Sequence, residues 1–179
     1  MEKPWYRRMF SSAPAQPNSS GAHARATEGD AAAQFYLGLH YSSSEGAAQD
    51  LPEALRWYRL AADQNHHLAQ FNLGVMLEKG QGTEKDGTAG RMWIRRAAEA
   101  GDAGAQFNCG NSCYREMMTT RENNVPALRI EAYMWFELAA VQGYRSSESS
   151  RDRVSVMMTH AEVAEANTRV ARFVVPAAA

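Results

Sequence analysis

The stretch AQFNLGVML (69–77) has close counterparts in AQFYLGLHY (33–41) and AQFNCGNSC (105–113). Its alanine, phenylalanine and glycine recur at intervals of 36 residues, at Ala33, Ala69 and Ala105, at Phe35, Phe71 and Phe107, and at Gly38, Gly74 and Gly110. A fixed interval of this length is the sequence signature of an array built from one repeated structural unit. The stretch therefore predicts a repeat protein.

A second phrase follows the first in every unit: EALRWYRLAA (53–62), AGRMWIRRAA (89–98) and EAYMWFELAA (131–140). Trp57 and Trp93 keep the interval of 36, whereas Trp135 follows after 42. The six additional residues fall between Gly110 and Trp135. We place them most simply in MMTTRENNV (117–125), which predicts an expanded loop and a second candidate contact surface at Met117-Met118.

Both phrases have the apolar spacing of an α-helix. Ala33, Leu37 and Tyr41 fall four residues apart on one face, and Trp57 and Ala61 do the same in the second phrase. Turn-forming residues such as GQGTEKDG separate the two phrases. Each unit is therefore predicted to be a pair of antiparallel helices.

The ends of these helices are also marked. Asn65, Gly101 and Gly143 follow the second phrase, and these residue types tolerate the left-handed conformation that commonly ends a helix. Asp30 and Asp102 stand where an N-cap would start the next helix.

One helix pair cannot bury its apolar faces alone, but stacked pairs can. The recurring glycine and the Ala-Ala pairs would let helix axes approach closely, and the tryptophans would fill the space between layers. Trp93→Ala is expected to cost about 3–5 kcal/mol if the ring is buried.

The order A-Q-[FY]-x-L-G, a G-x-G loop, an acidic residue and then A-x-x-W-x-x-x-A-A-x-x-G resembles the Sel-1-like repeat, a relative of the tetratricopeptide repeat. The resemblance extends from Asp30 to about Phe173, and residues 125–143 with 151–166 resemble the closing portion of many bacterial members. It implies an all-α fold, a right-handed α/α superhelical solenoid of helix-turn-helix repeats with a C-terminal capping helix pair.

Thr159-x-x-Glu162 reads as a capping box, so the last segment is predicted to form two short helices rather than one. Their outer face would be polar, with Glu162, Glu165, Arg169 and Arg172. The predicted divisions are a flexible N-terminal tail (1–29), repeats at about 30–65, 66–101 and 102–143, capping helices at about 147–173, and a short tail (174–179).

Composition limits the partners. The formal net charge of −1 gives no global attraction to nucleic acid or to an acidic membrane. No apolar run approaches the roughly 20 residues needed to span a bilayer. We expect a cytoplasmic location. Arg7, Arg8 and Arg25 leave open a transit peptide, and Arg7-Arg8 with Trp5, Tyr6 and Phe10 leave open a docking motif or membrane-surface contact; a disordered leader explains these residues as well.

No motif of a hydrolase, a metalloprotease or a phosphate-binding loop is present, so we expect no enzymatic activity and no cofactor. Cys109 and Cys113 align with apolar columns and are interpreted as core residues rather than zinc ligands. Adjacent His66 and His67 should point in different directions and are interpreted as a solvated junction.

Some columns change character between units yet fall on one narrow arc of the first helix. In the related tetratricopeptide fold this helix lines the concave side, so the resemblance implies a groove there. Aromatic, amide, Met and basic groups suit recognition of a peptide or protein, and an ordinary solvated stripe is the alternative. The predicted partner-binding residues are Tyr36, His40, Asn72, Met76, Lys79, Asn108, Ser112 and Arg115.

The sequence thus favours a protein-interaction scaffold without chemistry of its own. A cell-wall or glycan-related hydrolase or binding protein is one alternative, and a subunit that self-associates through FVVPAAA (173–179) is another. Partner identity and oligomeric state stay open.

Overall fold

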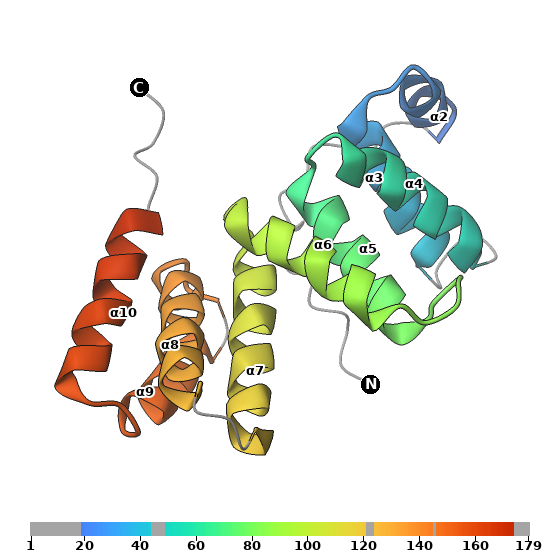
Figure 1. Ribbon diagram of the computed structural model, residues 1–179. Coiled ribbons are helices and arrows are strands. Elements are labelled where there is room, and N and C mark those ends of the chain that lie inside the picture. Colours follow the sequence, from blue (N-terminus) through green and yellow to red (C-terminus); the bar gives the residue numbers. More distant parts are fainter. Residues whose placement is uncertain (1–18, 44–48, 121–123, 145, 174–179) are drawn as a thin grey trace.

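The computed structural model describes residues 19–43, 49–120, 124–144 and 146–173 (Figure 1). Within these ranges the chain is helical, without strands, and the all-α prediction is confirmed. The helices are α2 (Ser19–Thr27), α3 (Ala31–Ser42), α4 (Leu51–Asp63), α5 (His67–Lys79), α6 (Gly87–Glu99), α7 (Ala103–Thr119), α8 (Val125–Val141), α9 (Ser147–Ser155) and α10 (His160–Phe173). Figure 1 shows an array that runs from α2 at one end to α10 at the other.

Three hairpins form the array, and each contains one first helix and one second helix. Unit one is α3 with α4, unit two is α5 with α6, and unit three is α7 with α8. The second helix of each unit also packs against the first helix of the next. Each unit therefore buries its apolar faces against its neighbours, as the repeat spacing predicts.

Aspartates begin the first helices of units one and three. Asp30 Oδ1 accepts a hydrogen bond from the Ala33 N–H at 2.9 Å, and Asp102 Oδ1 accepts from the Ala105 N–H at 2.7 Å. Each carboxylate satisfies an N–H that the first helical turn leaves without a partner. Both predicted N-caps are confirmed.

A residue with positive φ follows every second helix. The φ angles are 64° at Asn65, 95° at Gly101 and 68° at Gly143, as predicted. Gly29, with φ of 100°, follows α2 in the same way. Since α2 ends like a second helix, it occupies the place that the second helix of a preceding unit would take.

The prediction of a flexible tail at residues 1–29 is wrong for residues 19–29. Helix α2 packs on α3, and Ala22 and Ala26 are buried in that contact. The sequence pattern did not reveal this helix because its buried residues are alanines four apart, with no large apolar side chain to show a period. Residues 1–18, which hold the possible docking motif, lie outside the described residues, and so do residues 174–179. Of the segment FVVPAAA (173–179), the structure describes Phe173 alone.

The recurring glycine gives each hairpin its close contact. A Cβ added to Gly38 would lie 2.5 Å from Cδ1 of the Tyr58 ring, and one added to Gly110 would lie 2.7 Å from the Phe136 ring. Any larger residue would displace these rings, which are nearly fully buried. The predicted role of the small column is confirmed.

The tryptophan column is buried at its two ends but not in the middle. Trp57 is 2 % exposed and Trp135 is 1 % exposed, whereas Trp93 is only half-buried. The His23 ring of α2 meets Trp57 edge-on at 5.6 Å, and Phe173 of α10 meets Trp135 edge-on at 5.2 Å. The large cost predicted for Trp93→Ala assumed a buried ring, and the Trp93 ring is only half-buried. A cost of that size is therefore expected for Trp57 and Trp135 instead.

The insertion of unit three lengthens its helices rather than its loop. Helices α7 and α8 have 17 residues each, against 13 in α5 and in α6. Met117 is buried and Met118 is exposed on the last turns of α7. Residues 117–119 of the expected loop thus belong to α7 and Val125 begins α8, whereas residues 121–123 lie outside the described residues.

Two short helices close the array, as predicted. The Thr159 N–H donates to Glu162 Oε2 at 2.6 Å and the Glu162 N–H donates to Thr159 Oγ1 at 3.2 Å, so the capping box is confirmed. One detail of the polar outer face is wrong: Glu162 is buried, and Arg129 of α8 donates to its Oε1 at 2.7 Å. Glu165, Arg169 and Arg172 are exposed.

Candidate partner-binding surface

A buried glutamine fixes the rotation of every first helix. Each glutamine Nε2 donates to the carbonyl of an alanine in the preceding second helix or in α2: Gln34 to Ala26 at 3.0 Å, Gln70 to Ala62 at 3.2 Å and Gln106 to Ala98 at 3.2 Å. All three side chains are at most 4 % exposed. The sequence analysis gave this glutamine no role, although its presence in every copy of the opening phrase was the available signal.

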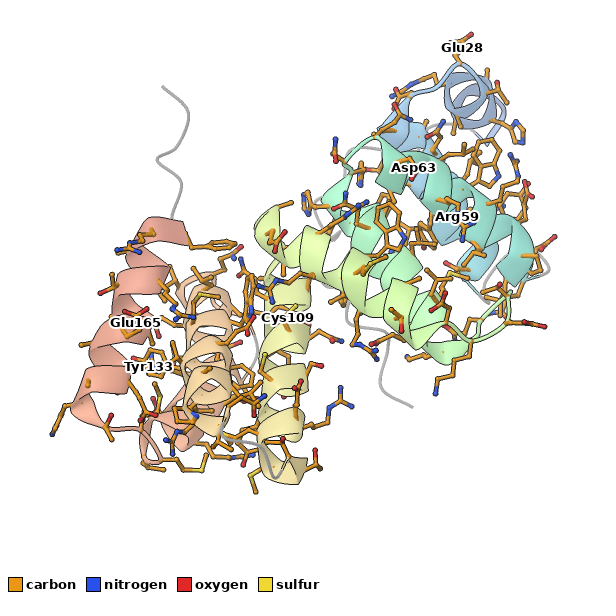
Figure 2. All side chains as sticks on the ribbon, in the orientation of Figure 1. Glu28, Arg59, Asp63, Cys109, Tyr133 and Glu165 are labelled. Atoms are coloured by element: carbon orange, nitrogen blue, oxygen red, sulfur yellow. The ribbon has the colours of Figure 1, made fainter. Side chains whose placement is uncertain are left out.

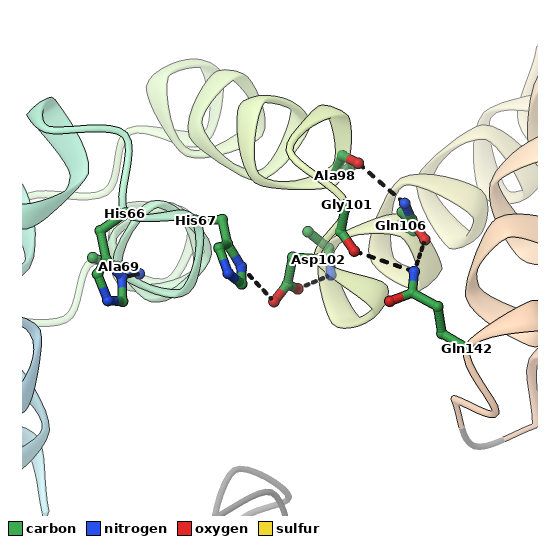
Figure 3. Close-up of polar contacts among 9 residues, drawn as sticks. His66, His67, Ala69, Ala98, Gly101, Asp102, Gln106 and Gln142 are labelled. Carbon is green, nitrogen blue, oxygen red and sulfur yellow. Dashed lines mark hydrogen bonds and ion pairs between the residues drawn. The ribbon is translucent and has the colours of Figure 1, made fainter. Parts of the chain in front are cut away.

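A further glutamine completes two of these three sites. Gln64 Nε2 donates to Gln34 Oε1 at 2.8 Å, and Gln142 Nε2 donates to Gln106 Oε1 at 2.8 Å and to the Gly101 carbonyl at 3.1 Å (Figure 3). The corresponding position of unit two is Ala100. There Gln70 Oε1 is buried and accepts no hydrogen bond from the described residues.

The position two residues after each buried glutamine points away from the core. Two residues turn a helix by about 200°, so a glutamine fixed inward places Tyr36, Asn72 and Asn108 on the opposite side. All three are half-buried. The Asn72 and Asn108 amides form no hydrogen bond within the described residues, in contrast to the buried glutamines of the same helices.

The other predicted residues extend this face toward the helix C-termini. His40, Lys79 and Arg115 are exposed, and Ser112 is half-buried. Among the described residues neither Lys79 nor Arg115 has a carboxylate partner. We call Tyr36, His40, Asn72, Lys79, Asn108, Ser112 and Arg115 the first-helix face.

Met76 does not belong to the first-helix face. It is 5 % exposed and lies in the same apolar cluster as Leu73 and Leu77. Its column contains His40, Met76 and Ser112, and such variety between units predicts an exposed position. In unit two the position packs inward, so an apolar side chain there is a core residue.

The histidine pair serves the junction between units one and two. His66 Nδ1 accepts from the Ala69 N–H at 3.3 Å and caps α5, and its ring stacks on Phe35 at 4.7 Å (Figure 3). Burial lowers the pKa of His66, and nearby His67 lowers it further. The rings of His66 and His67 lie 6.0 Å apart and nearly parallel, so the expected divergence is wrong. His66 is half-buried whereas His67 is exposed, so the predicted solvated junction holds for His67 alone.

His67 links units two and three. Its Nδ1 lies 3.5 Å from Oδ2 of Asp102, whose Oδ1 caps α7 (Figure 3). Since Asp102 is buried, a protonated His67 would place its charge beside a carboxylate that has little access to water. The first helices of these two units are therefore connected at their N-terminal ends.

Cys109 and Cys113 are core residues, as predicted. Cys109, labelled on α7 in Figure 2, shares a buried cluster with Trp135 and Leu138 of α8. Burial raises the pKa of both thiols to about 12, which keeps them protonated near neutral pH. Within the described ranges, no three His, Cys, Asp or Glu side chains converge on a possible metal site.

A cleft of about 380 Å³ lies between α6, α8 and α10. Trp135 contributes to its apolar wall, with the Arg95 guanidinium 5.0 Å from the ring centroid. Arg95 also donates to Glu131, and the Trp135 Nε1–H donates to the same carboxylate at 3.3 Å. The remaining lining residues are Glu99, Met134, Arg169, Arg172 and Phe173. The sequence pattern does not reveal this cleft, because its walls come from three separate helices, α6, α8 and α10.

Comparison with known proteins agrees with the repeat architecture. The model of the Sel1 repeat matches residues 31–66, 67–102 and 103–144, ranges that each begin one residue after the predicted unit start. No curated protein matches the chain. None of the described helices combines the length and apolar content that crossing a bilayer requires.

Two solved structures share the fold. The crystal structure of a protective antigen present in uropathogenic Escherichia coli strains, described as an SLR fold, is 29 % identical with a TM-score of 0.72, over 87 % of this chain and 32 % of that chain. A Sel1 repeat protein from Oxalobacter formigenes is 31 % identical with a TM-score of 0.60, over 69 % of this chain and 49 % of that chain. The chain thus spans only a third to a half of the length of these relatives.

Proposed function

Because this chain belongs to the Sel1 repeat family, whose members generally act as protein–protein interaction modules, we propose that it is a non-enzymatic scaffold that binds a peptide or protein partner along the first-helix face. The family assignment supports an interaction role. The choice of face comes from the side chains of this chain.

The observation that carries the proposal is the pair of amides at Asn72 and Asn108. Both stand at the same position of successive units, half-buried and without a hydrogen bond to the described residues. A side-chain amide offers one acceptor and two donor hydrogens, which matches the alternation of C=O and N–H along a peptide backbone. Two such amides at the repeat interval can hold an extended segment of a partner.

The charges beside the amides indicate which partner segment would fit. Lys79 and Arg115 are exposed in the C-terminal halves of α5 and α7 and have no carboxylate partner in the described part of the chain. A carboxylate on the bound segment would meet them with little competition. The bound segment is therefore expected to carry Asp or Glu, and binding should weaken as salt is raised.

A pull-down from cell extract tests the proposal, using the wild type, Asn72→Glu with Asn108→Glu, and the control Asn167→Glu on the exposed side of α10. The double variant should lose a partner that the wild type and the control retain. Circular dichroism should first show equal helicity for the three proteins. Identical partner lists from all three would remove the first-helix face from consideration.

A further inference from the structure

The outer side of α8 is covered by the last helix of the chain. Helix α10 packs along α8, with Val170 and Phe173 against the cluster that contains Met134 and Leu138. Met134 is 8 % exposed and Leu138 is 6 % exposed as a result. Unit three thus shows what the outer face of this repeat accepts: an amphipathic helix that lays its apolar stripe on it.

The same face of units one and two is open in the described structure. Met92 occupies in unit two the position of Met134 in unit three, and it is 57 % exposed. Leu60 occupies in unit one the position of Leu138, and it is 39 % exposed. Trp93, next to Met92 in sequence, is half-buried. Side chains that are core residues under α10 are therefore left on the surface of α4 and α6.

One ion pair of unit three has no counterpart among the described residues of this open face. Arg95 of α6 reaches forward to Glu131 of α8. One unit earlier the corresponding residues are Arg59, which Figure 2 labels on α4, and Ala89, so the carboxylate is missing. Arg59 consequently has no carboxylate partner within the described residues.

Two arginines of α6 also lack a carboxylate partner in the described part of the chain. Arg91 and Arg96 are exposed without a carboxylate partner in the described ranges, and the Arg96 guanidinium lies 4.7 Å from the ring centroid of Trp93. Asp63, at the position of Glu99, is an acidic neighbour on α4. The balance of unpaired charge on this face is positive.

We propose that the outer face of α4 and α6, which carries Arg59, Leu60, Met92, Trp93 and Arg96, docks an amphipathic helix of a partner protein that carries acidic residues beside its apolar stripe. The helix lies on α6 as α10 lies on α8. Its apolar residues cover Met92 and Trp93, and a carboxylate takes the place that Glu131 has in unit three and pairs with Arg59.

The N-terminal residues of this chain do not have the chemistry of the occupant. They include Lys3, Arg7 and Arg8 against Glu2, so their net charge has the same sign as the unpaired charge on the outer face of α4 and α6. An acidic partner helix complements the arginines and gains the bidentate geometry that guanidinium groups offer to carboxylates.

The probe is a labelled synthetic peptide that copies residues 159–173 with Arg169→Glu and Arg172→Glu, titrated with the full chain and followed by fluorescence anisotropy. It keeps the apolar stripe that α10 applies to α8 and adds acidic residues on its flank. We expect saturable binding that weakens with salt. Met92→Glu and, separately, Arg59→Glu should each weaken it by at least about tenfold.

The control is Met118→Glu on α7, since Met118 is 63 % exposed and lies in another unit. It should bind the peptide like the wild type, and so should Asn72→Glu with Asn108→Glu, which makes failure here distinguishable from failure of the first-helix face. No binding at millimolar protein, or equal binding by Met92→Glu and wild type, overturns the proposal. So does light scattering that shows a dimer abolished by Met92→Glu, because the occupant would then be a second copy.

Discussion

Unit two and unit three have nearly the same phrases but differ in how completely their side chains are satisfied. In unit three the Gln106 amide both donates and accepts a hydrogen bond, Asp102 caps the first helix and Trp135 is buried. In unit two the corresponding glutamine oxygen has no described donor, a histidine provides the cap and the tryptophan is half-buried. The repeat sets the fold, and single positions within it decide local stability and exposure.

The difference between the two tryptophans should produce the largest effect. Trp135→Ala should lower the free energy of unfolding by about 3–5 kcal/mol, because it leaves a cavity between α6, α8 and α10. Trp93→Ala should cost about 2 kcal/mol or less, since the ring is already partly in water. Urea denaturation followed by circular dichroism measures both. Equal losses in the free energy of unfolding would show that the partial exposure of Trp93 does not reduce its contribution to stability.

The next largest difference in stability between units two and three should come from substitutions of their recurring glycines. A Cβ on Gly74 would lie 2.8 Å from the Gly90 carbonyl oxygen, which is backbone, whereas at Gly110 it would meet the side-chain ring of Phe136. Backbone cannot yield without shifting a helix, so Gly74→Ala should destabilise by about 1–3 kcal/mol and Gly110→Ala by less.

Gly21 is the matched control for these glycines. It lies in α2 with no atom within 4 Å of an added Cβ, so Gly21→Ala should raise stability by up to about 1 kcal/mol through helix propensity alone. Thermal unfolding of the three variants gives the order. A Gly110→Ala protein less stable than Gly74→Ala would contradict the argument from backbone contact.

Ala100→Gln should make unit two resemble unit three. The backbone at Ala100 has φ −79° and ψ 2°, close to φ −86° and ψ 6° at Gln142, so a glutamine can take the same conformation. Its Nε2 would donate to Gln70 Oε1 and should stabilise the protein by about 1 kcal/mol.

Ala100→Glu is the control for this substitution, because a carboxylate of similar shape cannot donate to that oxygen. Chemical denaturation should rank Ala100→Gln above the wild type and Ala100→Glu below Ala100→Gln. If glutamine and glutamate act alike, the gain does not come from a hydrogen bond to the orphan Gln70 oxygen.

The sequence was sufficient for what every unit repeats and insufficient for what single units change. The helix pairs, the glycine contacts and the Asp30 and Asp102 caps follow from recurring residue types with one physical role each. Met76 was misplaced because a variable column was equated with exposure. Helix α2 was missed because alanines alone give no visible apolar period.

The open outer face of α6 could not be predicted from the sequence for a related reason. Exposure of Met92 depends on whether a helix from elsewhere in the chain covers it, and the sequence carries no sign of where α10 packs. The column that joins Met92 to Met134 could be read from the repeat, but only the structure shows that one is covered and the other is open. Repetition predicts position, and burial depends on the neighbours.

The smallest expected effect concerns the cap of α5 and depends on pH. Burial holds the pKa of His66 below its ordinary value of 6.5, and His67 adds to this while Asp30 opposes it. Above pH 6.5 both the folded and the unfolded state leave His66 neutral. As pH falls through 6.5, the unfolded chain takes up a proton that the folded chain resists, so the free energy of unfolding decreases until the folded pKa is passed.

His66→Asp tests this, since aspartate caps the corresponding helices of units one and three and keeps its charge down to about pH 4. Protonated His66 also loses the lone pair that accepts from the Ala69 N–H, whereas the aspartate would still accept. The variant should therefore gain stability over the wild type by about 0.5–1 kcal/mol at pH 5, and by less at pH 8. A stability difference that stays constant between pH 5 and pH 8 would mean that His66 does not titrate with folding, and the contrast between the caps of units two and three would then be one of shape alone.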